Sequence, residues 1–120
     1  MFNIVFYKDR KGKTPVLDYI TALTKSSNKD GRINANKIYD YVDVLREVGT
    51  AAGEPYIKRL DGEIWELRPI RSRILFAAWD GDSFILLHHF TKKTQKTPQK
   101  EIDQAKRELT DWTERGKDDE

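Results

Sequence analysis

Positively charged side chains are concentrated in segment 68–100 of this 120-residue chain. Only Asp80 and Asp82 are acidic there, so the segment carries about +5, against +2 for the whole chain. Its cations are Arg68, Arg71, Arg73, Lys92, Lys93, Lys96 and Lys100. A local excess of this size favours binding of a polyanion, and the phosphates of RNA fit that description.

The two histidines do not predict a metal site. His88 and His89 are consecutive in a predicted strand, so they point to opposite faces and cannot both ligate one ion. No Asp or Glu lies nearby at metal-ligand spacing, and the chain has no cysteine. We therefore expect no metal and no other cofactor. His89 is expected in the core, whereas His88 can titrate near neutrality or donate to a phosphate.

Length and composition predict one soluble domain. A chain of 120 residues with 38% hydrophobic content can bury one core. The apolar run at 1–6 is too short for a signal peptide, and no segment reaches the roughly 20 apolar residues of a membrane span. We expect a cytoplasmic protein with a single domain over residues 1–116 and a charged tail over residues 117–120.

Three helices follow from start signals and apolar spacing. The Thr-Pro pair at 14–15 starts a short helix, because the hydroxyl can accept from a free amide and proline loses no hydrogen bond there. The pair at 97–98 starts the last helix, which should end at Gly116. Between them, Gly49 ends a longer helix. Its apolar side chains share one face, and they are Ile38, Tyr41, Val42, Leu45 and Val48.

Five strands complete the expected order. Residues 2–7 are rich in β-branched and aromatic side chains, which is typical of a strand. Turn signals at 61–62 and 80–82 define two hairpins, joined by a tight connection at 69–70. The order is therefore β-α-α-β-β-β-β-α, an α+β fold with an antiparallel sheet packed against helices.

Strand alternation predicts which charges meet on this sheet. A two-residue turn at Ile70 and Arg71 places Arg68 opposite Arg73, and Glu66 opposite Leu75. Two-residue loops in the two hairpins add further residues to the same face, namely Ile57, Arg59, Ile64, His88, Phe90 and Lys92. The other face is apolar and should receive the helices through Trp65, Leu67, Ile74, Phe76, Ala78, Ile85 and Leu87. We expect one covered face and one cationic face.

Two explanations of the cationic face remain open. Arg68 opposite Arg73 costs like-charge repulsion unless Glu66 or an external anion offsets it, and a bound phosphate is the simplest such anion. Alternatively, the charged face is only the solvated side of an antiparallel sheet.

The motifs WELR at 65–68 and FTKKTQKTP at 90–98, together with Arg73, resemble toxins of the RelE/ParE superfamily, in particular the phage-derived HigB-like branch. The resemblance extends from the first strand to the last helix. It implies a RelE-like fold and a type II toxin-antitoxin toxin, a ribosome-dependent mRNA endoribonuclease that inhibits translation and growth. It also implies a partner, a HigA-like antitoxin with a helix-turn-helix DNA-binding domain, held in a toxin-antitoxin hetero-oligomer.

Such an enzyme must help a ribose 2′-hydroxyl attack the adjacent phosphate, without a metal. Under the resemblance, Arg68 and Arg73, both expected on the solvent face, would stabilise the phosphorane. Lys92 or Lys93 would transfer a proton or clamp the phosphate electrostatically. The terminal helix lacks the Tyr or His that several RelE-type toxins carry, so His88 is the fallback for proton transfer. The RNA backbone would contact Arg59, Arg71, Gln95 and Lys96.

Two other functions fit the same fold. A ParE-like toxin would inhibit DNA gyrase by binding it, without cleaving RNA. A nucleic-acid-binding module would hold RNA without catalysis. The cluster of Arg68, Arg73, Lys92 and Lys93 favours the nuclease, because a gyrase inhibitor has no need of converging phosphate ligands.

Overall fold

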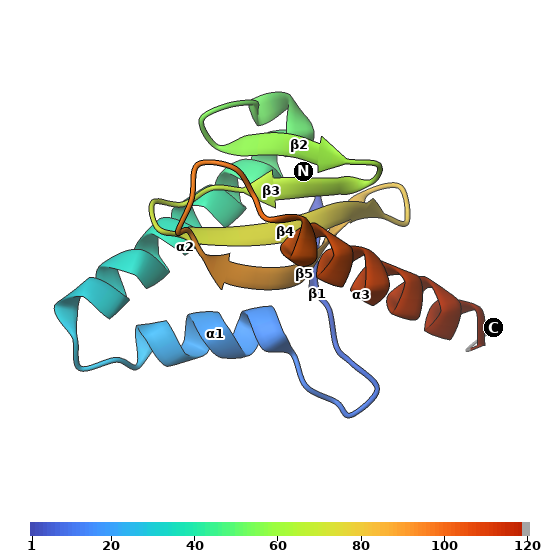
Figure 1. Cartoon of the computed structure of the whole chain (residues 1–120), viewed down its shortest axis with the longest axis horizontal. Coiled ribbons are helices and arrows are strands. Elements are labelled where there is room, and N and C mark those ends of the chain that lie inside the picture. Colours follow the sequence, from blue (N-terminus) through green and yellow to red (C-terminus); the bar gives the residue numbers. More distant parts are fainter. Residues whose placement is uncertain (119–120) are drawn as a thin grey trace.

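A computed structural model describes residues 1–118 and has a five-stranded sheet with helices on both of its faces (Figure 1). Its elements are β1 (Asn3–Phe6), α1 (Pro15–Thr24), α2 (Lys29–Val48), the 3-10 helix η1 (Gly49–Ala52), β2 (Ile57–Asp61), β3 (Ile64–Leu67), β4 (Ser72–Trp79), β5 (Ser83–Thr91) and α3 (Gln99–Asp118). Apart from η1, this order confirms the predicted α+β fold. Within residues 1–118, no helix is long and apolar enough to cross a membrane.

The strands are arranged in the order β1-β5-β4-β3-β2. Strands β2 to β5 form the predicted antiparallel meander. Strand β1 joins the far edge in parallel with β5, with Val5 opposite Ile85. Turn signals pair only strands that follow one another along the chain, so this long-range pairing was not predicted.

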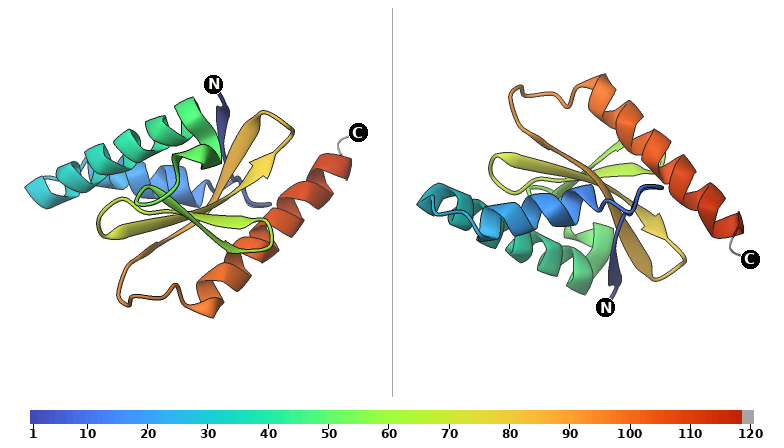
Figure 2. Two further views of the ribbon diagram at one scale, coloured as in Figure 1. Left: turned by 90° about the horizontal axis from the view of Figure 1, so that it is seen from above. Right: turned by 90° about the horizontal axis from the view of Figure 1, so that it is seen from below.

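Helices cover both faces of the sheet, which corrects the prediction of one covered and one cationic face. Figure 2 shows α1 and α2 on one face and α3 on the other. The first core contains Val16, Ile20, Ile38, Val42 and Leu45 against Leu67, Ile74, Phe76 and Leu86. The second contains Ala105, Leu109 and Trp112 against Ile64, Leu75, Ala77, Ile85 and Leu87. The prediction that Ile85 and Leu87 share a face with Leu67, Ile74 and Phe76 is therefore wrong.

The register of β4 and β5 explains this error. Trp79 pairs with Ser83, so the connecting loop has three residues and not two. A one-residue change in register moves every following side chain to the other face. A bulge beside Leu75 then compensates for the change, because this residue pairs with His88. His88 and Phe90 consequently have the predicted register, whereas the residues between the loop and the bulge do not.

The hairpin of β2 and β3 also differs from its prediction, but through a register shift in β2 and not through the length of its loop. Asp61 pairs with Ile64, and the register shifts between Asp61 and Arg59. Lys58, not Ile57, therefore lies opposite Glu66. Ile57 is buried in the first core, and Arg59 lies opposite Trp65. The predicted position of Arg59 beside Glu66 on the cationic face is wrong.

The predicted helix starts and ends are close to those observed. α1 begins at Pro15, although the hydroxyl of Thr14 donates to Asp18 Oδ1 at 3.1 Å instead of accepting from an amide. α2 ends at Val48 and is capped by Gly49, whose φ of 64° favours glycine. α3 continues through Gly116 to Asp118, two residues past its expected end. The remainder of the predicted tail, residues 119–120, lies outside the described residues.

Candidate active site

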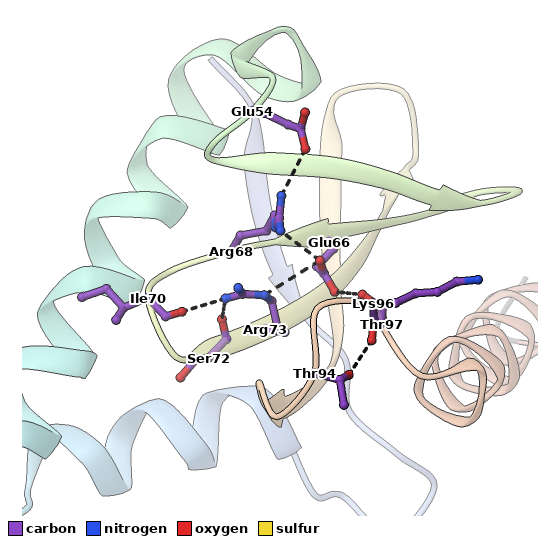
Figure 3. Close-up of polar contacts among 9 residues, drawn as sticks. All are labelled: Glu54, Glu66, Arg68, Ile70, Ser72, Arg73, Thr94, Lys96 and Thr97. Atoms are coloured by element: carbon purple, nitrogen blue, oxygen red, sulfur yellow. Dashed lines mark hydrogen bonds and ion pairs between the residues drawn. The ribbon is translucent and has the colours of Figure 1, made fainter.

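A buried carboxylate, Glu66 on β3, organises the polar end of the sheet (Figure 3). Glu66 is only 2% exposed. Glu66 Oε1 lies 3.5 Å from Arg68 Nε and 3.9 Å from Arg73 Nε. Glu66 Oε2 accepts a hydrogen bond from the Thr97 hydroxyl at 2.5 Å. One carboxylate therefore joins two arginines of the sheet to the segment that precedes α3.

Arg73 is buried, which corrects the expectation that it lies on the solvent face. Only 6% of the residue is exposed. Its Nη1 donates to the carbonyls of Ser72 at 2.8 Å and Ile70 at 3.0 Å. Burial lowers the pKa of its guanidinium, and Glu66 acts against that shift. Since the residue is buried and its Nη1 is engaged by two carbonyls, Arg73 supplies a positive charge that is fixed in place.

Arg68 lies one residue beyond the end of β3, and its side chain is 24% exposed. The predicted turn is confirmed, because Ser72 N donates to Pro69 O at 2.9 Å around Ile70 and Arg71. Leu67 pairs with Ile74, so the next positions along the two strands are those of the two arginines. Arg68 Nη1 also donates to Glu54 Oε1 at 3.1 Å. Protein carboxylates thus offset the repulsion between Arg68 and Arg73, and a bound phosphate is not required for that purpose.

The loop between β5 and α3 carries most of the remaining cations. Lys92 N donates to Arg71 O at 2.7 Å, which fixes the start of the loop against the turn before β4. Thr94 Oγ1 donates to Lys96 O at 2.6 Å, which folds the loop on itself. The side chains of the loop lysines are exposed, and they are Lys92, Lys93 and Lys96.

Two clefts lie on either side of the segment 95–97. The main cleft has a volume of about 390 Å³ and is lined by Arg73, Phe90, Thr91, Lys92, Lys93, Thr94, Gln95, Lys96, Thr97, Pro98, Lys100 and Glu101. The side cleft has a volume of about 340 Å³ and is lined by Lys58, Arg59, Leu60, Glu66, Arg68, Gln95, Lys96, Thr97 and Ile102. Gln95, Lys96 and Thr97 border both clefts.

The predicted site residues are therefore only partly brought together. Arg73, Lys92 and Lys93 line the main cleft, whereas Arg68 and Arg59 line the side cleft. The guanidinium of Arg59 donates to Gly62 O at 3.2 Å, and Arg71 is exposed in the turn without lining either cleft. Arg68 and Arg73 meet at Glu66 and do not open into one common cavity.

The two histidines point to opposite faces, as predicted. His89 stacks on Tyr19 of α1 with ring centroids 4.2 Å apart, and burial lowers its pKa. It therefore has the character of a core histidine. His88 lies under α3, where its Nε2 is 3.1 Å from Glu101 Oε1 and its Nδ1 is 3.7 Å from Glu108 Oε1. Among residues 1–118, no group of three or more His, Cys, Asp or Glu side chains is arranged to hold a metal.

Four residues at the site were not predicted to act there: Lys58, Thr97, Glu101 and Glu108. Thr97 was interpreted only as a helix start, although a hydroxyl ahead of a Pro can equally bond elsewhere. Glu101 and Glu108 lie at positions that place them on one side of α3, but their contact with His88 depends on how the helix docks. No local pattern in the sequence predicts that docking.

The chain thus belongs to the class of small α+β domains that carry a lysine-lined cleft at one end of an antiparallel meander. Residues 18–110 match the family model of phage derived Gp49-like proteins (DUF891), and the chain belongs to this family. This match confirms in part the predicted relation, at the level of the phage-derived family. A search of the curated proteins gave no match.

Replacing Arg73 by Ala should lower the free energy of unfolding by about 3–5 kcal/mol, the usual cost of removing one partner from a buried ion pair. Arg68→Ala should cost about 1 kcal/mol, because Arg68 is partly solvated. Urea denaturation followed by circular dichroism measures both. Adding Glu66→Gln to Arg73→Ala should restore part of the loss, since it removes a buried charge that has lost one of its two arginines. Equal losses for the two arginine variants would contradict the buried role of Arg73.

Glu108 should make stability depend on pH near neutrality. Burial raises the pKa of this carboxyl from 4.5 to about 7, so the folded state keeps a proton that the unfolded state has already released. Stability contributed by the neutral form is therefore lost as pH rises from about 4.5 to 7, by up to about 3 kcal/mol. Glu108→Gln should remove this loss and be the more stable protein at pH 8. Glu114→Gln, at an exposed position of the same helix, is the control. Parallel stability curves for wild type and Glu108→Gln would refute the assignment.

Proposed function

We propose that this chain is the toxin of a type II toxin-antitoxin system and that it cleaves mRNA engaged with the ribosome. The observation that carries the proposal is the main cleft, where four lysines and the buried charge of Arg73 surround a cavity of about 390 Å³. Membership of the Gp49-like family supports it independently. The proposed substrate places the action of the protein in the cytoplasm.

The cleft suits phosphoryl transfer from RNA. Exposed ammonium groups on the β5–α3 loop can contact successive phosphates, and fixed positive charge at the floor stabilises charge that develops on the phosphorane. This fixed charge is the guanidinium of Arg73, which Glu66 and two backbone carbonyls hold in place. Arg68, Arg59 and Lys58 line the neighbouring side cleft, where they can hold the RNA backbone beyond the reacting phosphate.

The proposed reaction requires no bound metal. Attack of the 2′-hydroxyl on the adjacent phosphate needs only proton transfer and charge stabilisation. Lysine and arginine side chains supply the positive charge that a divalent cation supplies in many nucleases. The charged side chains of the cleft therefore suit a ribonuclease that uses lysine and arginine in place of a metal ion.

Brief induction of the wild-type chain in cells should produce new RNA 5′ ends within ribosome-bound messages, detected by primer extension. The double variant Lys92→Ala, Lys93→Ala should reduce cleavage on the order of 100-fold, because it removes two exposed charges that contact the phosphates. The control is Lys25→Ala, Lys29→Ala, which removes the same charge from exposed positions just after α1 and at the start of α2. Growth arrest by the wild type without new RNA ends, accompanied by loss of DNA supercoiling, would favour the ParE-like gyrase inhibitor.

We further propose that the antitoxin binds the α1–α2 side and leaves the main cleft open. Exposed apolar side chains on that side include Leu17 of α1 and Ile33 and Tyr39 of α2, which are 38%, 42% and 46% exposed. The main cleft offers mostly exposed lysines to solvent. Binding on the helices would block entry to the ribosome without neutralising the cleft.

Lys93→Glu should abolish toxicity yet change antitoxin affinity by less than about tenfold, or roughly 1.4 kcal/mol. Tyr39→Asp should weaken antitoxin binding by more than that and leave cleavage unchanged, since Tyr39 lies on α2 and outside both clefts. Isothermal titration of each variant with the helix-turn-helix protein encoded beside the chain measures both effects. Arg73→Glu is not used for this test, because a charge reversal at a buried residue would also disturb the fold. A larger loss of antitoxin affinity for Lys93→Glu than for Tyr39→Asp would show that the antitoxin covers the active cleft.

A further inference from the structure

Glu101 is an acidic side chain in a cleft whose other charged residues are all cations. It lies in the first turn of α3, and among the described residues that line the main cleft it is the one carboxylate. Its side chain is 18% exposed, so it is largely enclosed but reaches the cavity. A negative charge here weakens phosphate binding, so its presence calls for a role other than holding the phosphate.

His88 holds Glu101 from below. The imidazole Nε2 lies 3.1 Å from Glu101 Oε1, so the N–H tautomer at Nε2 donates to the carboxylate. The opposite ring nitrogen, Nδ1, lies 3.7 Å from Glu108 Oε1, and Glu108 is only 7% exposed. A carboxylate, an imidazole and a second carboxyl are thus aligned from the cleft into the protein. An orienting group behind a proton acceptor is the arrangement that general-base sites share.

We propose that Glu101 accepts the proton of the attacking ribose 2′-hydroxyl and that His88 positions its carboxylate. The inference rests on the proposed endoribonuclease function and assigns the base that this reaction requires. It replaces the direct proton-transfer role predicted for His88, which lines neither cleft.

The 2′-oxygen transfers its proton to a Glu101 oxygen and forms a bond to the adjacent phosphorus. The bond from phosphorus to the 5′-oxygen breaks, and that oxygen takes a proton from the ammonium of Lys92 or Lys93. The products are a 2′,3′-cyclic phosphate and a 5′-hydroxyl. No oxidant, reductant or cofactor enters the step.

The groups around Glu101 fit this role. Lys92, Lys93 and Lys100 line the cleft beside it, and they can stabilise the phosphorane while the carboxylate removes the proton. His88 of β5 contacts Glu101, and Glu108 of α3 faces the other side of the His88 ring. An ion pair that only docks α3 on the sheet would not need to open into the cavity.

The test compares wild type, Glu101→Gln and Glu101→Asp in single-turnover cleavage of a ribosome-bound message. Two messages are used, one natural and one in which sulfur replaces the 5′-oxygen at the cleavage site. A thiolate leaves without a proton, so loss of the base slows both messages equally, whereas loss of the acid slows only the natural one. Glu101→Gln should slow both by about 100-fold or more. Glu101→Asp, which keeps the charge but shortens its reach, should slow both by about tenfold. Glu114→Gln should have no effect.

His88 is tested by conservative rescue. His88→Ala should slow both messages about tenfold, and His88→Gln should restore most of the rate, because its amide can still donate to Glu101. Matched melting temperatures control for folding. Full activity of Glu101→Gln or Glu101→Asp, or recovery of Glu101→Gln on the sulfur message, would overturn the assignment and leave the nuclease function standing. A wild-type chain that leaves both messages intact would refute the nuclease function and this role together.

Discussion

The buried carboxylate of Glu66 is the interaction on which the polar end of this fold depends. It lies between Arg68 and Arg73 of the sheet and accepts from the Thr97 hydroxyl, so it joins β3, the start of β4 and the segment before α3. Removing a charge from water is costly unless it is paired and hydrogen-bonded. The arginines and the threonine satisfy that requirement, and in doing so they hold the lysine loop beside the sheet.

The pairing with Glu66 gives the cations two different roles: a buried arginine that is fixed in the fold, and exposed lysines that are free to bind phosphate. Arg73 is buried and engaged with two carbonyls, whereas the loop lysines are exposed around the main cleft. α3 completes the arrangement because its first turn closes the cleft and carries Glu101 toward it. The fixed charge of buried Arg73 and the exposed ammonium groups of the loop together give a phosphate site that is partly preorganised.

Local signals in the sequence were sufficient for the elements but not for every face of the sheet. Apolar spacing and turn dipeptides predicted the order of elements, and the turn at Ile70 placed Glu66 opposite Leu75 correctly. The β4–β5 loop is one residue longer than assumed, which moved Ile85 to the other face, and a register shift between Arg59 and Asp61 moved Arg59. The burial of Glu66 and the contact of His88 with α3 depend on segments distant in the chain. No local pattern determines them.

Cleavage of one defined message by the purified chain on programmed ribosomes tests the central claim most directly. The account predicts a discrete cut whose upstream fragment ends in a 2′,3′-cyclic phosphate and whose downstream fragment begins with a 5′-hydroxyl. The Lys92→Ala, Lys93→Ala variant should give the same cut at a rate lower on the order of 100-fold. An intact message at full occupancy of the ribosome by the chain would contradict the account.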